Sequence, residues 1–303
     1  MRLINAWLIR RRKDKFLRIL KDRQNSSQSV LGVSPFFVSA FDSDTRSIIE
    51  EGIPSYESIS ILLDEVHCRH QETIVNEIAI DVGANYGTYS ILFSRYFKSV
   101  IAYEAHPVTF KILEQNLGQL PNIQVNPYAI SSSTGQGLIH EYRKNHSGSA
   151  SLENLHWVAE NPLKSSQVQK STLDIQLGAI TSKIGLIKID VEGHELEVLK
   201  GSRQILSSQK PAIIFENNTG EKAVLNFLQD FGYDTFLVSS ADLVKRFTNK
   251  RQLLLFLMKC RNPIGIFWKL YSGNYLMELP IDSLQKCELV LTFHNDKSPQ
   301  SIP

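Results

Sequence analysis

Residues 78–90 read IAIDVGANYGTYS, a sequence typical of a buried strand that passes through a tight turn into a helix. The apolar run ends at Asp81, and Gly83 and Gly87 follow before the helical pattern begins. Glycine tolerates positive φ and lets a ligand approach the backbone closely, while the start of a helix offers free N–H groups. The stretch therefore predicts a small-molecule site at the end of a strand.

Short β-branched runs alternate with helical patterns on both sides of this turn, which is typical of βαβ units around a parallel sheet. We expect strands at residues 77–82, 99–103, 123–128, 184–191, 212–216 and 233–238. We expect helices at residues 56–70, 88–96, 107–117, 195–207 and 221–231. Weaker patterns predict strands at 137–142 and 274–279, and a short helix or strand at 171–177. The prediction is an α/β fold whose mostly parallel sheet carries helices on both faces.

Length and composition fit a globular chain. With 303 residues, 42% hydrophobic and 21% charged, the sequence is neither disordered, collagen-like nor a polytopic membrane protein. Its three cysteines lie far apart without a C-x-x-C pair, which argues against a disulfide scaffold and favours a reducing, cytoplasmic compartment. We divide the chain into a basic helical extension with a linker (1–54) and a main domain (55–303) with an insertion at about 241–273.

Two segments are strongly basic. Residues 1–23 contain nine basic and two acidic side chains, and residues 245–269 contain seven basic ones around apolar runs. Basic residues beside exposed apolar ones suit a peripheral contact with an anionic membrane. The alternative is that the basic residues are solvated and that the apolar run at 253–258 is core or a lid over the acceptor pocket.

An acidic residue ends the second expected strand, 21 residues after Gly83. Glu104 can accept hydrogen bonds from both hydroxyls of a ribose, so turn and acid together predict a nucleoside pocket. A nicotinamide dinucleotide requires G-x-G-x-x-G around its pyrophosphate, and here three residues separate Gly83 from Gly87. S-adenosylmethionine has no phosphate and is the other ligand that fits. The residues leave open a methyltransferase, an oxidoreductase and a nucleoside-binding partner protein without turnover.

Further segments match one known pattern in the same order along the chain. They are VIAYEAHP at 100–107, TLD at 172–174, IGLIKIDVEGHELEVLKGSRQIL at 184–206 and PAIIFEN at 211–217. Together with residues 78–90 they resemble the FkbM family of S-adenosylmethionine-dependent methyltransferases, over about residues 55–240. The K-I-D-V-E-G-x-E block is the most specific piece. Ala105-His106 and His194 depart from the family pattern.

The resemblance implies a class I methyltransferase fold and O-methylation of a hydroxyl on a sugar, a glycan or a natural product. It implies that the methionine end of the cofactor lies against Asp81, Gly83, Ala84, Asn85 and Gly87. It also implies that Glu104 holds the ribose and that Ala129 and Ile130 lie near the adenine. The expected partner is a small-molecule or saccharide acceptor.

Acidic, imidazole and amide side chains follow the fourth and fifth expected strands, at the sheet edge where such folds bind ligands. They are Asp190, Glu192, His194, Glu195, Glu216 and Asn217. A hydroxyl acceptor needs positioning and gains from a base, so we take Asp190, His194 and Glu216 as catalytic candidates. Asp190, Glu216 and Asn217 are also suitable ligands for Mg²⁺. The structural alternatives are a helix cap for Asp190, a surface histidine, and acids that favour a helix N-terminus.

Two motifs are misleading. Asn126-Pro127-Tyr128 resembles the N-P-P-Y motif of enzymes that methylate DNA bases, but it lies on the third strand and lacks one proline. We therefore expect no nucleic-acid partner. His67 and His70 would share a helix face, but a zinc site needs further ligands, so we expect a surface pair.

Overall fold

A computed structural model describes residues 35–39, 42, 45, 48, 53, 56–143, 146–154, 161–217, 222–239, 276–278 and 287–294. The basic segment at 1–23 and the insertion at 241–273 lie outside these residues. The helical extension, the insertion and the membrane contact assigned to them therefore stay predictions. Within the described part of the chain, no helix has both the length and the apolar character needed to cross a membrane.

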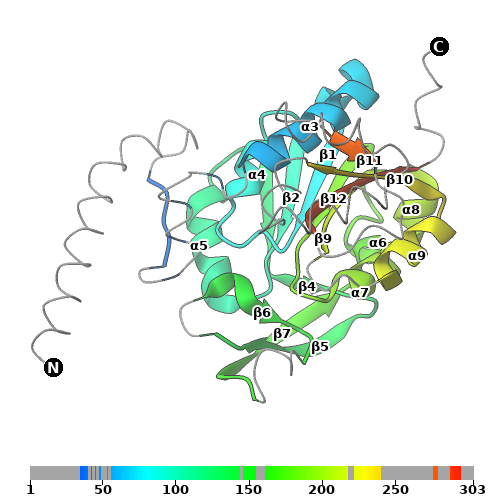
Figure 1. The fold of residues 1–303 in the computed structure, drawn as a ribbon. Coiled ribbons are helices and arrows are strands. Elements are labelled where there is room, and N and C mark those ends of the chain that lie inside the picture. The colour runs from blue at the N-terminus through cyan, green and yellow to red at the C-terminus, as the bar shows by residue number, and fades with distance from the viewer. Residues whose placement is uncertain are drawn as a thin grey trace, which may run out of the picture.

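An eight-stranded sheet forms the centre of the molecule, in the order β11-β10-β12-β9-β8-β1-β2-β3 (Figure 1). The strands are β1 (Ile78–Val82), β2 (Ser99–Tyr103), β3 (Ile123–Asn126), β8 (Ile184–Ile189), β9 (Ala212–Asn217), β10 (Tyr233–Ser239), β11 (Leu276–Glu278) and β12 (Cys287–His294). The neighbours from β9 to β3 pair in parallel. β12 is antiparallel to both β9 and β10, and β11 is antiparallel to β10.

Helices cover both faces of this sheet. They are α3 (Tyr56–His70), α4 (Thr88–Phe93), α5 (Pro107–Leu117), α6 (Leu173–Gln176), α7 (Glu195–Lys200), α8 (Arg203–Gln209) and α9 (Lys222–Asp230), with a 3₁₀ turn η1 (Gln71–Asn76) after α3. Because side chains alternate along a strand, Ile80 packs on the face covered by α6 to α9, and Ala79 packs on the face covered by α3 to α5. The expected α/β fold with two helical layers is confirmed.

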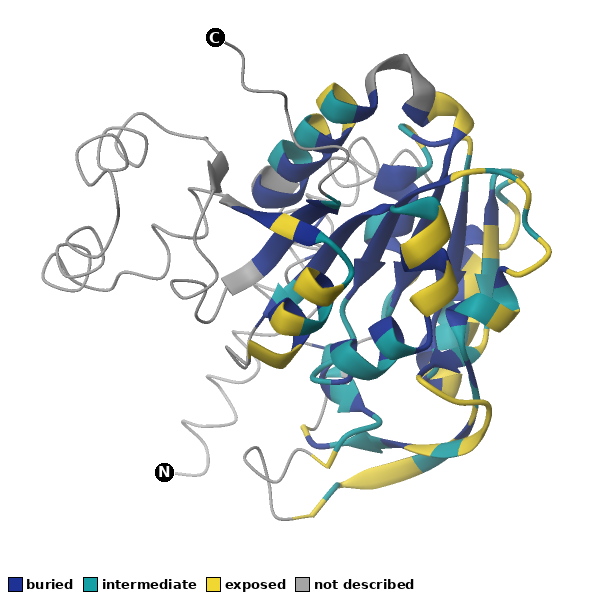
Figure 2. Ribbon diagram, turned by 90° about the vertical axis from the view of Figure 1, so that its right-hand side faces the viewer, coloured by how far each residue is buried: buried dark blue, intermediate teal, exposed yellow. Residues whose placement is uncertain are grey.

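A second, four-stranded sheet lies beside the carboxyl ends of the central strands (Figure 1), in the order β4-β7-β5-β6. Its strands are β4 (Tyr128–Ile130), β5 (Gly135–Glu141), β6 (Ala150–Ser151) and β7 (Lys164–Ser171), with a 3₁₀ turn η2 (Ser147–Ser149) before β6. The expected strand at 123–128 was wrong as one unit. Pro127, which has no N–H to donate, separates β3 in the central sheet from β4 in the small one. The outer side of β5 and β7 is exposed (Figure 2).

Two other expectations needed correction. The helix expected at 195–207 is interrupted at Gly201 and Ser202, where the backbone leaves the helical conformation, so that α7 ends at Lys200 and α8 begins at Arg203. Gly201 fits there because a Cβ would lie 2.1 Å from the backbone oxygen of Ser131. β7 and β12 were not expected from the sequence. The late strand at 274–279 is confirmed by β11, and residues 171–177 contain the helix α6.

Part of the segment expected to be an extension packs on the main domain. The amide of Asn116 on α5 donates to the backbone oxygen of Phe37 and its side-chain oxygen accepts from the Phe37 N–H, at 2.9 and 2.6 Å. The hydroxyl of Tyr86 donates to Asp42 at 3.1 Å. Ile48 reaches the cavity described below. Phe37, Asp42 and Ile48 therefore contact the main domain near the turn or its cavity.

Candidate functional site

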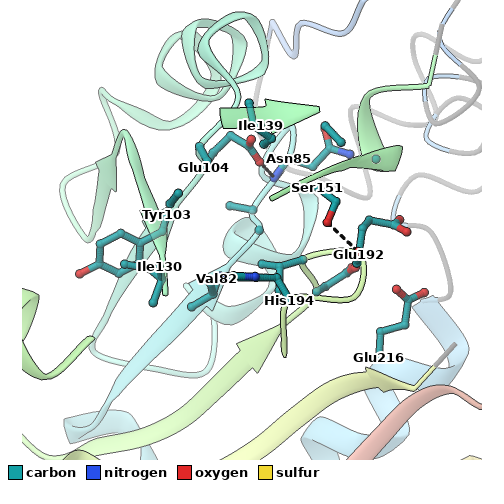
Figure 3. A pocket seen from close by; sticks show the side chains of 18 of the residues that line it. Val82, Asn85, Tyr103, Glu104, Ile130, Ile139, Ser151, Glu192, His194 and Glu216 are labelled. Atoms are coloured by element: carbon teal, nitrogen blue, oxygen red, sulfur yellow. Dashed lines mark hydrogen bonds between the residues drawn. The ribbon is translucent and has the colours of Figure 1, made fainter. Parts of the chain in front are cut away.

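A cavity of about 300 Å³ lies where the carboxyl ends of β1, β2, β8 and β9 meet the small sheet (Figure 3). The cofactor residues expected from the sequence that line it are Gly83, Ala84, Asn85, Glu104, Ala129 and Ile130. All three catalytic candidates, Asp190, His194 and Glu216, also line it. Nine of the site residues expected from the sequence therefore line this one cavity.

The turn after β1 is shaped by backbone bonds and positive φ angles. The N–H groups of Gly83 and Ala84 both donate to the backbone oxygen of Tyr103, at 3.0 Å each, which fastens the turn to β2. Gly83 has φ 77° and Asn85 has φ 49°. A Cβ on Gly83 would lie 1.8 Å from the backbone oxygen of Asp190. No side chain fits there, so the turn keeps a bare backbone facing the cavity.

Glu104 is held by the backbone on both of its carboxylate oxygens. The N–H of Asn85 donates to one oxygen at 2.9 Å, and the N–H of His106 donates to the other at 2.8 Å. Burial raises the pKa of Glu104, and these two donors act in the opposite direction. The side chain of His106 is fixed in turn by Glu141 of β5, with 3.0 Å between Nε2 and the carboxylate. The acid is therefore oriented from both sheets.

Asp81 and Gly87, which the resemblance assigns to the cofactor, are not among the residues that line the cavity. Asp81 is fully buried below the turn, where the hydroxyl of Ser90 donates to it at 2.6 Å. Gly87 packs its backbone against Leu117 and Leu113 of α5, with φ 95°. The physical reason is strand alternation: Asp81 points away from the side on which Val82 and the turn meet the cavity.

Three carboxylates gather at the other side of the cavity. The side chains of Asp190, Glu192 and Glu216 each place an oxygen within 4.8 Å of the others. Burial, followed by the neighbouring charges of Asp190 and Glu192, raises the pKa of Glu216. The acceptor-side acids expected from the sequence are therefore neighbours in space.

Asn217, the third ligand expected for Mg²⁺, lies on a different side of β9 from Glu216, and its role as a ligand stays a prediction. Asn217 is buried and pairs with Cys287 of β12, whereas Glu216 is half-buried in the cavity wall. Successive residues of a strand point to opposite faces, which is why the two side chains lie on different sides. Glu192 is the third carboxylate of the group, beside Asp190 and Glu216.

The loop between β8 and α7 has an unusual backbone. Glu192 has φ 52° and Gly193 has φ 96°. One carboxylate oxygen of Glu195 accepts from the N–H groups of Val191 and Gly193, at 3.2 and 3.1 Å. Ser151 of β6 donates to the backbone oxygen of Glu192 at 2.8 Å. Glu195 therefore shapes the loop, which agrees with the structural alternative considered for it.

Both ring nitrogens of His194 are engaged by side chains. Nδ1 lies 2.6 Å from the carboxylate of Glu153, and Nε2 lies 3.0 Å from the hydroxyl of Ser131. These contacts link the loop after β8 to the ends of β4 and β6. In this arrangement His194 joins the two sheets, and the catalytic role expected for it stays a prediction.

Lys188 is a functional-site residue that sequence reasoning missed. Its side chain is 1% exposed and lies in the cavity wall, with Nζ 3.1 Å from Asp190 and 3.5 Å from Asp81. Burial lowers the pKa of this ammonium, but the two carboxylates outweigh burial and raise it. A lysine inside the otherwise apolar strand IGLIKI was the signal that could have found it.

The chain is similar in sequence to characterised methyltransferases and, more distantly, in fold to solved structures. The sequence is 30% identical over 159 residues to the hexuronic acid methyltransferase AglP of Haloferax volcanii, covering 50% of this chain and 60% of that protein. It is 27% identical over 198 residues to the methyltransferase sdnD of Sordaria araneosa, covering 52% of this chain and 76% of that protein. The chain thus spans less than two thirds of the first relative's length.

Solved structures resemble it more distantly. The FkbM methyltransferase of Methylobacillus flagellatus is 14% identical, with a TM-score of 0.39, covering 89% of this chain and 59% of that one. Precorrin-6y C5,15-methyltransferase of Geobacter metallireducens is 12% identical, with a TM-score of 0.38, covering 77% of this chain and 86% of that one. At such scores the fold assignment rests on the strand order.

That strand order, parallel except for β12 and the edge strand β11 and covered by helices on both faces, is the class I, Rossmann-like methyltransferase fold. The profile of the methyltransferase FkbM domain matches residues 81–235, just over half of the chain. The match contains the turn after β1, Glu104, the loop after β8 and Glu216, which are the parts that meet at the cavity. The chain belongs to the FkbM family of methyltransferases.

Proposed function

We propose that the protein transfers a methyl group from S-adenosylmethionine to a hydroxyl of a sugar, a glycan or a natural product. The observation that carries this proposal is that one cavity joins Glu104, a buried acid suited to a ribose, to the acid pair Asp190 and Glu216. A nucleoside cofactor and an acceptor hydroxyl would then meet in a space shared by both sheets.

The residues of the turn fit the cofactor. Each oxygen of Glu104 accepts one backbone N–H, and a carboxylate oxygen has a further lone pair with which to accept a ribose hydroxyl. Gly83 lines the cavity with its backbone, and we assign the methionine end to that backbone. Ala129 and Ile130 offer an apolar surface for the adenine.

The charge of the cavity argues against a nicotinamide dinucleotide. Four carboxylates line it, those of Glu104, Asp190, Glu192 and Glu216. Among the described lining residues, Lys188 is the sole lysine or arginine, and Asp190 already lies 3.1 Å from its ammonium. A pyrophosphate needs cationic or N–H partners, whereas a sulfonium is favoured by nearby carboxylates.

When bound, S-adenosylmethionine supplies a methyl group on a positively charged sulfur. The chain's own residues hold the reactants and move one proton. Asp190 is placed to accept a hydrogen bond from the acceptor hydroxyl and so to orient its oxygen. Burial and its acidic neighbours raise the pKa of Glu216, so in its ionised form Glu216 is a stronger base than an exposed acid and accepts the proton that the reacting hydroxyl loses. His194 keeps the small sheet closed over the cavity.

The acceptor class is supported by the family and by the relative that acts on a hexuronic acid. A panel of neutral sugars, uronic acids and hydroxylated natural products, assayed for release of S-adenosylhomocysteine, tests it. We expect turnover on at least one hydroxyl compound and loss of that turnover in Asp190→Asn. Methylation of amines alone would contradict the hydroxyl assignment.

Mg²⁺ remains a hypothesis for the group Asp190, Glu192 and Glu216. Hard oxygen ligands suit this ion, and a bound ion would lower the pKa of an acceptor hydroxyl. The mutual distances of at most 4.8 Å between these carboxylate oxygens are compatible with one shared ion. Lys188 competes for Asp190, because its ammonium already lies beside that carboxylate.

Calorimetry with S-adenosylmethionine, S-adenosylhomocysteine and the nicotinamide dinucleotides tests the cofactor. We expect both adenosyl compounds to bind and Glu104→Gln to weaken them by about 1.5–3 kcal/mol, the usual contribution of hydrogen bonds to a charged group. Glu197→Gln on α7 is the matched control, since Glu197 bonds to Ser132 and Lys200 outside the cavity. Tighter binding of a dinucleotide would support the oxidoreductase alternative. Adenosyl binding without turnover on any acceptor would support the non-catalytic one.

A further inference from the structure

The ammonium of Lys188 contacts two segments that line the cavity. Its Nζ donates to the backbone oxygen of Gly83 at 3.2 Å and lies 3.1 Å from the carboxylate of Asp190. Gly83 belongs to the turn after β1, and Asp190 belongs to the loop after β8. A third oxygen, on the fully buried carboxylate of Asp81, lies 3.5 Å away. Asp81 and Lys188 are paired in register across β1 and β8, so the position of the ammonium follows from the sheet itself.

The two segments touch at this point. The N–H of Asp190 donates to the backbone oxygen of Val82 at 3.1 Å, and the backbone oxygen of Asp190 excludes any Cβ on Gly83. The ring of Tyr89, which lines the cavity, lies 5.0 Å from the same ammonium, a contact that favours the cation. A change at Lys188 therefore acts on the turn and on the loop together.

We propose that Lys188 is a positioning residue that couples the cofactor turn to the acceptor side: it fixes the Gly83 carbonyl and the Asp190 carboxylate relative to each other and offsets one negative charge in the cavity wall. This inference rests on the proposed function, because it concerns the cofactor and acceptor sides of that same cavity.

The alternative is a buried ion pair that only holds the fold together. Replacing such a pair by apolar groups is often neutral for stability, so stability alone cannot separate the two roles. The charge can. Without Lys188 the carboxylate of Asp190 is no longer offset, and a cationic ligand should gain relative to a neutral one of the same shape. S-adenosylmethionine and S-adenosylhomocysteine are such a pair, since they differ in the methyl group and its positive charge.

The experiment measures the affinities of both compounds by calorimetry in the full chain. Lys188→Met removes the ammonium but leaves Asp81 buried without its cation, so this variant can fail to fold. The double variant Asp81→Asn and Lys188→Met removes both charges and keeps the contact between Ser90 and residue 81. Lys183→Met is the matched control, because Lys183 pairs with the buried Glu77 at the opposite end of the strands.

In the double variant we expect S-adenosylhomocysteine to bind about tenfold more weakly, the effect of losing a hydrogen bond from a charged group. We expect S-adenosylmethionine to lose less, so that the ratio of the two affinities shifts towards the cation by about threefold or more. Lys183→Met should leave both affinities and their ratio as in the wild type.

A folded double variant whose affinities match the wild type would overturn the proposal, and so would an equal loss for both compounds, which a purely structural role predicts. Thermal unfolding of each variant identifies the folded ones. If the wild-type chain binds neither compound, the proposed function fails, which is a separate result from a failure of the variants.

Discussion

Buried carboxyl groups are paired differently at the two ends of the central sheet. At the amino ends of the strands, His70 Nδ1 and Lys183 Nζ each lie 2.5 Å from the carboxylate of Glu77. His70 is thus buried, which corrects the expected surface pair with His67. At the carboxyl ends, Asp81 and Asp190 share Lys188, and Glu216 lies beside them. At the amino ends the buried acid has a basic partner of its own, whereas at the carboxyl ends several acids lie around one lysine.

The pKa values follow this difference. Burial by itself raises the pKa of Glu77, but the hydrogen bonds from His70 and Lys183 outweigh burial and lower that pKa to about 2. At the carboxyl end, burial raises the pKa of Glu195 to about 6, and Asp190 contributes in the same direction. A matched charge stabilises the fold, whereas unmatched acids cost stability and are retained where ligands bind. Perturbed acids of this kind are typical of functional sites.

The largest expected effect is on stability at the amino end. Glu77→Gln keeps the shape of a side chain that is 2% exposed and removes its charge. We expect a loss of about 3 kcal/mol in the free energy of unfolding at pH 7, as for a broken buried pair, with cofactor affinity unchanged. Urea unfolding and calorimetry measure the two quantities.

The same variant has a pH signature. Because the folded pKa of Glu77 lies below the unfolded value, its contribution is present above about pH 4.5 and is lost as the pH falls towards 2. Wild-type stability should therefore decrease in that window more steeply than that of Glu77→Gln. A variant as stable as the wild type at pH 7 would show that the amino end is not the stabilising one.

A smaller effect of opposite sign is expected at the carboxyl end. A carboxyl whose folded pKa is raised binds more protons in the folded state, so its contribution to stability falls as the pH rises from about 4.5 through about 6. Glu195→Gln retains an oxygen for the N–H groups of Val191 and Gly193 but does not titrate. Relative to the wild type, it should gain about 2 kcal/mol between these pH values.

Unfolding curves at pH 4.5 and 7 measure this gain. Glu197→Gln is the control from the same helix, because Lys200 and Ser132 lower the pKa of Glu197, and its stability should not gain as the pH rises. If the free energy of unfolding changed equally with pH in the wild type and in Glu195→Gln, the expected difference between the two ends of the sheet would be wrong.

The smallest effect concerns Mg²⁺. If the acids at the carboxyl end hold the ion, Mg²⁺ should raise the free energy of unfolding by about 1 kcal/mol at concentrations several times its Kd, and a chelator should reverse the gain. Thermal unfolding of the wild type and Glu192→Gln measures it, with the variant gaining less. An unchanged midpoint with and without Mg²⁺ would exclude the metal hypothesis for Asp190, Glu192 and Glu216.

Much of this arrangement was predictable from local sequence. The turn at 83–87 and the acid at Glu104 follow strands whose apolar runs are unmistakable, and the carboxyl ends of parallel strands must share one edge. The structure confirmed that Gly83, Ala84, Asn85 and Glu104 line a common cavity with Asp190 and Glu216. The cofactor roles assigned to them stay predictions until binding is measured.

The small sheet was not predictable in the same way. Pro127 ends the pairing of β3, but nothing local says that β4 then pairs with β7, which begins 36 residues after Tyr128. β7 is rich in serine, glutamine and lysine, so no apolar alternation identified it. Its place in the sheet depends on hydrogen bonds between segments far apart in the chain.

By itself, the sequence determined most strands and helices of the central parallel sheet, the glycine turn and the acids that follow β2, β8 and β9, because apolar periodicity and glycine chemistry act between neighbours along the chain. The tertiary structure alone decided that Asp81 lies beside Lys188 below the turn, that Glu192 lies beside Asp190 and Glu216, and that His194 links two sheets. Those outcomes depend on strand register and on which face each side chain occupies, and register is set by packing across the whole sheet.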